Sequence, residues 1–248
     1  MSGRKTLVLD GGLAATLLVS AHDDEGRLAM FMVDADHAGV SVIARDSNTN
    51  VISSTLQSIG EVDMGRQQSL TEFINWGASN LPAQNYAVVV WDHGSGTIGG
   101  SAFDDSPANS YLTNAEVRQA VAASTLQRVA VLGFDACLMS MAEVMSEAAP
   151  VADRLVASVM TEPGDGWDYT AFLSQFAASA STDASALASL IVDTYGTFYR
   201  DQQTLSSVDL GQASQVEAAI NAFATAMRGA STADWQAVRT ARTRATEA

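Results

Sequence analysis

The chain has 248 residues, 47% of them hydrophobic, which is enough apolar material for a full buried core. Its 28 acidic and 13 basic residues give a formal charge of −15, so the surface repels nucleic acid and anionic membranes and attracts basic peptides. We therefore expect no nucleic-acid partner, and no apolar run reaches the roughly 20 residues that a membrane span needs.

The first 21 residues allow two interpretations. They combine basic residues, an apolar stretch and a Val-Ser-Ala end, as a signal peptide does, although Asp10, Gly11 and Gly12 interrupt the apolar region. A short buried strand at residues 6–9 explains the same letters. The first interpretation favours a secreted or extracytoplasmic protein over a cytoplasmic one, and both stay open.

Strand and helix signals alternate along the middle of the chain. Ser69 with Glu72, and Thr113 with Glu116, have the spacing of helix capping boxes. Apolar, β-branched runs before, between and after them predict strands buried on both faces, at residues 39–44, 86–91, 128–134 and 155–159. The alternation predicts an α/β fold, with an open, mostly parallel sheet flanked by helices on both faces.

The C-terminal part is mostly helical in pattern. Asp183 opens a run with helical apolar spacing, the strand-like "LSSVDL" follows at 205–210, and a second helical run ends at Gly229. Residues 232–248 then indicate a polar helix with little to bury. No repeat or long linker is present, so we expect one domain.

The stretch "AVVVWDHGSGTIGG" at residues 87–100 combines two chemistries. From Gly94 onward it fits the Gly-x-Gly-x-x-Gly pattern of dinucleotide sites, whereas one residue earlier it places His93 at the end of a strand. A dinucleotide site needs a helix that begins inside the motif. Here the following residues have loop chemistry, and Asp104 and Asp105 would repel a pyrophosphate, so we prefer the histidine interpretation.

Cys137 is the only cysteine, which excludes an intrachain disulfide, and the three histidines lack the spacing of a metal site, so we predict no metal. It follows the strand at 128–134 and precedes residues with helical spacing. We therefore expect it at a helix N-terminus, where the helix dipole stabilises a thiolate. A lone cysteine is more often a buried small hydrophobe. However, His93 and Cys137 both follow strands of one sheet, at the edge where ligand crevices form.

These residues resemble a known family. "WDHGSG" at 91–96 and "FDACLMSM" at 134–141 resemble the clostripain-like cysteine peptidases of the caspase-like clan, whose dyad is a His in a His-Gly turn and a Cys in an Asp-Ala-Cys turn. Four further blocks are similar and follow in the family's order: "GEVDMG" at 60–65, "LTNAEV" at 112–117, "ASVMTEPGDGWDYTAFL" at 157–173 and "LSSVDL" at 205–210.

The resemblance implies a division of the chain. Residues 55–212 would be the catalytic domain, residues 213–248 its C-terminal helices, and residues 1–54 a poorly matched N-terminal segment. Many members of the family mature by cutting themselves after a basic residue between the His and the Cys. Residues 94–117 of this chain contain no Lys or Arg, so we expect no such cut.

The resemblance also implies roles for individual residues. Cys137 would be the nucleophile and His93 the general base and acid, because a free thiol is only slightly ionised at neutral pH. The N–H groups of Gly94 and Cys137 would form the oxyanion hole. No cofactor is implied, although calcium dependence occurs in the family.

The substrates implied are peptides or proteins with Arg or Lys before the scissile bond. Asp135 matches the acidic residue of the family's substrate pocket and can bind a guanidinium group through two hydrogen bonds, although an Asp at this place can also cap a helix. Thr161 and Asp165 are weaker candidates for the pocket wall. A second hypothesis keeps the fold without the chemistry: a caspase-like domain that binds basic peptides or a protein partner and does not cleave. The oligomeric state is not readable from these patterns.

Overall fold

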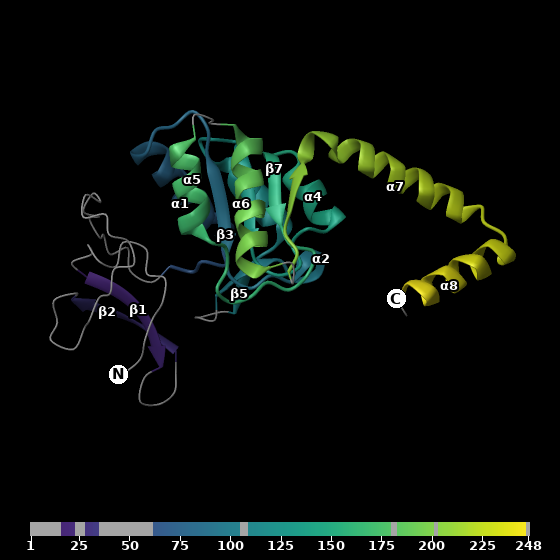
Figure 1. Cartoon of the computed structure of the whole chain (residues 1–248), viewed down its shortest axis with the longest axis horizontal. Helices are drawn as coiled ribbons and strands as arrows, with labels where there is room; N and C mark the ends of the chain where they lie inside the picture. The colour runs from purple at the N-terminus through teal and green to yellow at the C-terminus, as the bar shows by residue number, and fades with distance from the viewer. Residues whose placement is uncertain are drawn as a thin grey trace. The chain divides into compact units, whose positions relative to one another are not determined.

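The structure, a computed structural model, describes residues 16–22, 28–34, 62–104, 109–179, 183–200 and 203–246 (Figure 1). It forms two compact units, residues 1–61 and residues 62–248. In the first unit, β1 (Thr16–His22) and β2 (Leu28–Asp34) pair as an antiparallel hairpin. The strands predicted at 6–9 and 39–44 lie outside the described residues, and the domain boundaries stay a prediction.

The second unit is built on a four-stranded sheet with the order β3-β6-β7-β8. Its first three strands are parallel and its last one is antiparallel: β3 (Ala87–Trp91), β6 (Val129–Asp135), β7 (Ala152–Ala157) and β8 (Ser206–Asp209). The prediction placed β3 and β6 within one residue of their ends. It placed β7 too late, at 155–159, because the charged Asp153 and Arg154 interrupt the apolar pattern at the start of the strand and the apolar Val159 is exposed beyond its end.

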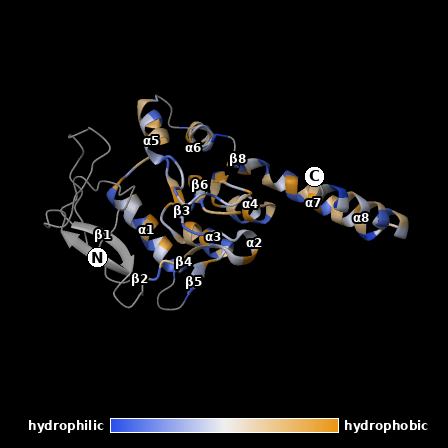
Figure 2. Ribbon diagram, turned by 60° about the horizontal axis from the view of Figure 1, so that its bottom comes forward, coloured by the Kyte–Doolittle hydropathy of each residue, from blue (hydrophilic) through white to orange (hydrophobic). Residues whose placement is uncertain are grey.

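Helices cover both faces of this sheet, as predicted. In Figure 2 the helices α5 and α6 lie on one side of the strands, and α1 and α3 lie on the other. The helices of the first group are α5 (Tyr169–Ala178) and α6 (Ala184–Tyr199), and those of the second are α1 (Gln67–Asn80), α3 (Asn114–Ala123) and α4 (Ala142–Ala148). The sequence therefore specified an α/β fold of the correct class.

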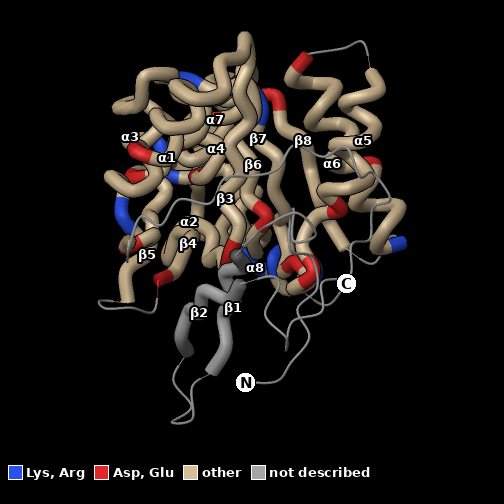
Figure 3. The backbone as a smooth tube through the Cα atoms, turned by 90° about the vertical axis from the view of Figure 1, so that its left-hand side faces the viewer, with Lys and Arg blue, Asp and Glu red and all other residues tan. Residues whose placement is uncertain are grey.

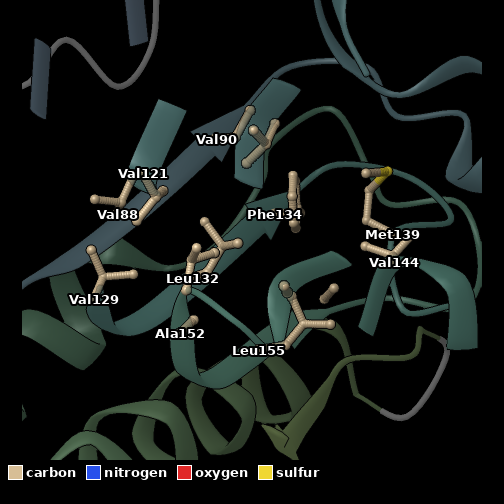
Figure 4. Close-up of a cluster of buried hydrophobic side chains, with 14 of the residues drawn as sticks. Val88, Val90, Val121, Val129, Leu132, Phe134, Met139, Val144, Ala152 and Leu155 are labelled. Atoms are coloured by element: carbon tan, nitrogen blue, oxygen red, sulfur yellow. The ribbon is translucent and has the colours of Figure 1, made fainter. Parts of the chain in front are cut away.

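The central strand β6 supplies apolar side chains to both layers. Leu132 and Phe134 pack in the core under α1, α3 and α4, and Val131 packs in the core under α5 and α6. Figure 4 shows the first of these clusters, with Leu132 and Phe134 beside the side chains of β3 and β7. Burial on both faces explains the unbroken apolar run of this strand.

Helix starts follow local chemistry in one place and tertiary contacts in another. Thr113 and Glu116 form the predicted capping box at the start of α3. The box predicted at Ser69 is wrong, because α1 begins two residues earlier and Ser69 donates to the carbonyl oxygen of Asp63, 2.5 Å away. The turn around Asp63 therefore sets the start of α1.

The segment after β3 does not form the long helix of a dinucleotide site. A single turn, α2 (Gly96–Gly99), leads into a small hairpin of β4 (Ser101–Asp104) and β5 (Ser110–Leu112). At the other end of the chain, η1 (Leu210–Gln212) and α7 (Ala213–Arg228) follow β8, and α8 (Thr232–Thr246) is a polar helix, as predicted. Within the described ranges, no helix is long and apolar enough to cross a membrane.

Candidate active site

His93 and Cys137 lie beyond the carboxyl ends of two neighbouring parallel strands. Trp91 on β3 is aligned with Asp135 on β6, so each candidate residue stands two positions past an aligned pair. Parallel strands deliver such residues to the same edge of the sheet. The His93 side chain is exposed and Cys137 is half-buried, so solvent reaches both.

Gly94 packs directly against the backbone of Cys137. A Cβ atom at Gly94 would collide with the carbonyl oxygen of Cys137 and lie 3.0 Å from its amide nitrogen. Gly94 also forms a bridge with Ser101, which ties the loop after His93 to β4. The close approach requires glycine and sets the backbone of the histidine loop beside that of the cysteine turn.

Cys137 does not lie at a helix N-terminus, so the prediction that the helix dipole acts on its thiol is wrong. Helix α4 begins only at Ala142. Leu138 has a φ of 66°, and its N–H donates to the carbonyl oxygen of Met160 at 2.9 Å. Ser140 pairs in the same way with Ser158. The turn after β6 is therefore held against the loop that follows β7, in a backbone conformation that a non-glycine residue rarely adopts.

That loop provides the hydrogen-bond partner of the sulfur. The N–H of Glu162 donates to Cys137 Sγ at 3.2 Å, and the Glu162 carbonyl oxygen lies 3.8 Å from the same atom. The loop from residue 158 to residue 168 therefore forms one wall of the site. In place of the helix expected from the sequence, an amide from a distant segment faces the thiol.

Asp135 is a buried carboxylate close to the nucleophile candidate. Its side chain is 3% exposed, and Oδ2 accepts hydrogen bonds of 3.0 Å from the Trp167 N–H and from the Tyr169 hydroxyl. Burial raises the pKa of Asp135 against the effect of these donors. Because α4 is capped at Met141, the alternative of a helix cap at Asp135 is wrong.

Glu162 is a site residue that the sequence analysis missed. Its Oε2 accepts a hydrogen bond from Trp167 Nε1 at 3.2 Å, while Oε1 is buried and accepts no hydrogen bond from the described residues. Burial and then the neighbouring Asp135 raise the pKa of Glu162 to about 9. The only sequence signal was its position in the "TEPGDGW" block, where a polar residue before Pro-Gly is typical of a loop.

Thr161 and Asp165 are exposed on the same loop, on either side of Glu162. Asp165 acts electrostatically on Tyr199 of α6. The structure thus brings Gly94, Cys137 and Asp135 together around the end of β6 and leaves the two weaker candidates at the surface. Within the part of the chain that is described, no group of three His, Cys, Asp or Glu side chains could hold a metal ion.

Comparison with known proteins gives one family. The model of the Clostripain family matches residues 20–244. The clostripain of Hathewaya histolytica is 30% identical over 141 residues, which are 50% of this chain and 26% of that protein. The chain therefore spans about a quarter of that curated relative.

Two solved structures share the fold. A secreted C11 cysteine protease from Bacteroides thetaiotaomicron, in complex with an irreversible peptide inhibitor, has a TM-score of 0.54 at 18% identity, covering 82% of this chain and 55% of its own. An inactive zymogen of a C11 protease from Parabacteroides distasonis has a TM-score of 0.51 at 18% identity, covering 82% and 50%. This chain thus spans about half the length of each.

Proposed function

Because this chain belongs to the clostripain family of cysteine peptidases, we propose that it is a cysteine endopeptidase that cleaves after arginine or lysine, with Cys137 as nucleophile and His93 as general base and acid. The observation that carries the proposal is the backbone contact between Gly94 and Cys137 at the ends of two parallel strands. This contact supports a common site for the histidine loop and the cysteine turn.

The reaction follows from the chemistry of the two side chains. His93 takes the thiol proton, and the Cys137 thiolate attacks the scissile carbonyl carbon. The N–H groups of Gly94 and Cys137 donate to the oxygen that becomes negative. The tetrahedral intermediate collapses to a thioester and releases the amine, which receives the proton from His93. Water, deprotonated by His93, then hydrolyses the thioester and restores the thiol.

Charge supports the preference for a basic residue before the cut. The protein carries a formal charge of −15, and Figure 3 shows acidic positions outnumbering basic ones along the backbone. Asp135 is two residues from Cys137, and a carboxylate in such a dry place makes strong charge-assisted hydrogen bonds with a guanidinium group. The substrates would be basic peptides or proteins.

Steady-state kinetics tests this function. Peptide amides with Arg, citrulline or norleucine before a chromogenic leaving group are incubated with the wild type and with the Cys137→Ala and His93→Ala variants. We expect the Arg substrate to be preferred and both variants to lose at least about a thousandfold in kcat, because the pair acts as a unit. Unchanged melting curves show that the variants are folded. Retention of most turnover by Cys137→Ala would refute the nucleophile assignment.

The second candidate, a domain that binds basic peptides without cutting them, gives a different result in the same assay. It binds the Arg peptide and releases no leaving group, in the wild type as in the variants. The half-buried thiol with its 3.2 Å hydrogen bond from Glu162 favours the enzyme, since a pure binding site has no need of a solvent-accessible sulfur there.

A further inference from the structure

The carboxyl groups of Asp135 and Glu162 meet beside Cys137. If both were ionised, the hydrogen bond between them could not form. Asp135 and Glu162 both use Trp167 as a donor, the first through its backbone N–H and the second through its ring nitrogen. A hydrogen bond between the two side chains also raises the pKa of Glu162 and lowers that of Asp135. Two ionised carboxylates cannot bond to each other, because neither has a proton to donate.

A single proton on Glu162 allows the two carboxyl groups to form a hydrogen bond. Glu162 Oε1 is buried and accepts no hydrogen bond from the described residues, and protonation of this carboxyl group provides an O–H donor for Asp135. Burial and the charge of Asp135 favour the neutral form, with a pKa for Glu162 of about 9. The geometry and the electrostatics thus agree on one proton for the pair.

Within the described part of the chain, no basic side chain neutralises the pair of Asp135 and Glu162. Among the described residues, the arginines of the ion pairs bind other acids, and the influences on the pKa values of Asp135 and Glu162 include no basic side chain.

The titratable groups around the pair come from every neighbouring element: Tyr169 on α5, Tyr195 and Tyr199 on α6, Asp165 and Asp168 on the loop, and Cys137 in the turn after β6.

The three tyrosines cannot take over the proton exchange. The pKa of each of the three tyrosines is raised, above all by burial, so they stay neutral at physiological pH. Tyr195 is 1% exposed, and its hydroxyl has no hydrogen-bond partner among the described residues. This part of the site therefore combines one surplus negative charge with a buried hydroxyl that has no partner among the described residues, which suits a cationic, hydrogen-bonding ligand.

We propose that Glu162 is a second acid of the substrate pocket, holding a proton against Asp135 in the free protein and releasing it to solvent when a cationic side chain binds. The inference rests on the proposed preference for Arg or Lys and explains how two acids can bind a cationic side chain. A guanidinium or ammonium group provides donors to both acids, so the shared proton is no longer needed and leaves to water. Binding of a basic side chain is then linked to pH, and binding of a neutral one is not.

The sign of the linkage is fixed by the two states of Glu162. In the free protein the group is protonated below about pH 9, and in the complex the nearby cation lowers its pKa. Between those two values the complex binds fewer protons than the free protein, so affinity rises with pH. The rise is at most about tenfold per pH unit, the limit for one proton.

Calorimetric titration tests the proposal on the full chain carrying Cys137→Ala, which prevents turnover and removes the thiol proton from the balance. The ligands are N-acetyl-Ala-Ala-Arg N-methylamide and its citrulline analogue, which is nearly isosteric and neutral. Titration at pH 7 in two buffers of different ionisation enthalpy gives the number of protons released. We expect about one proton for the Arg peptide and none for the citrulline peptide.

The Glu162→Gln substitution in the same background separates a specific role from a structural one. A glutamine amide still donates to Asp135 and accepts from Trp167 Nε1, so the protein should fold, but it has no proton to release. We expect proton release to fall to near zero and the pH dependence of affinity between pH 6 and pH 8 to flatten. Glu217→Gln, at an exposed glutamate on α7, is the matched control and should behave like its parent.

The outcomes separate this inference from the proposed function. Tight binding of the Arg peptide without proton release overturns the inference and leaves an Arg-directed peptidase intact. Equal binding of the Arg and citrulline peptides overturns both the inference and the basic preference. If the wild-type protein cleaves neither peptide while proton release persists, the proposed peptidase function is refuted and the proton-linked cation site is supported.

Discussion

Gly94 lies so close to Cys137 that any side chain at position 94 would collide with the Cys137 carbonyl oxygen. This contact joins the loop that carries His93 to the turn that carries the thiol, and it brings together the backbones of the two residues that we propose for the oxyanion hole. The close approach of the two backbones therefore requires glycine at position 94 for steric reasons.

Gly94→Ala should lower kcat/KM by about a hundredfold or more, the loss typical of removing one oxyanion donor. Gly77→Ala is the matched control, because Gly77 lies within α1 and a Cβ there has no neighbour within 4 Å. That variant should keep full activity and gain about 1 kcal/mol in stability from helix propensity. Peptidase assays and thermal melts of both proteins measure these effects. Normal activity in Gly94→Ala would show that the two loops are not coupled.

Asp135→Asn should reduce the preference for Arg over norleucine. A charge-assisted hydrogen bond contributes about 1.5 to 3 kcal/mol, so the ratio of the two kcat/KM values should fall by one to two powers of ten. Asp165→Asn, at an exposed carboxylate, should change that ratio by less than about fivefold. Equal losses on both substrates in Asp135→Asn would make Asp135 a support of the Trp167 loop.

Stability should fall as pH rises, on account of Glu162. Its pKa is 4.5 in an ordinary environment and about 9 in the folded protein, so between these values the folded state binds more protons than the unfolded one. The free energy of unfolding contributed by this group is fully present below about pH 4.5 and is lost as pH approaches 9, at no more than about 1.4 kcal/mol per pH unit. Urea unfolding at several pH values measures the slope, which should be smaller in Glu162→Gln. An identical slope in that variant would mean that Glu162 is already ionised in the folded state.

The active protein should not cut itself between Gly94 and Val117, the part of the His93–Cys137 connection that lacks basic residues. Residues 94–117 contain no Lys or Arg, so a peptidase that cuts after basic residues finds no site there. Self-incubated wild type, analysed by denaturing gel and mass spectrometry, should show no break in this range. A break that is present in the wild type and missing in Cys137→Ala would contradict the prediction.

The sequence was sufficient where local chemistry decides the structure. The run at β6 is apolar because it is buried on both faces, and the Thr113 cap works within a single turn, so both were predicted correctly. The class of fold followed from the alternation of such elements.

The sequence was insufficient where contacts between distant segments determine the local structure. Cys137 was expected at a helix start, but hydrogen bonds between the turn and residues 158–162 keep it non-helical, and α4 begins only at Ala142. Glu162 gave no signal of its own, because its importance arises from Asp135, 27 positions earlier in the sequence and adjacent in the fold. Neither the loop pairing nor the meeting of two acids has a pattern within a short window of sequence.

Active-site labelling shows whether Cys137 is a nucleophile beside a cation-selective pocket. The native protein is treated with a tripeptidyl-arginine chloromethyl ketone or its citrulline analogue, and intact mass and peptide mapping locate the adduct. We expect one adduct per chain, on Cys137, formed much faster with the arginine reagent than with the citrulline reagent and slowed strongly in His93→Ala. An unmodified Cys137 in the native protein, or equal rates for the two reagents, would contradict it.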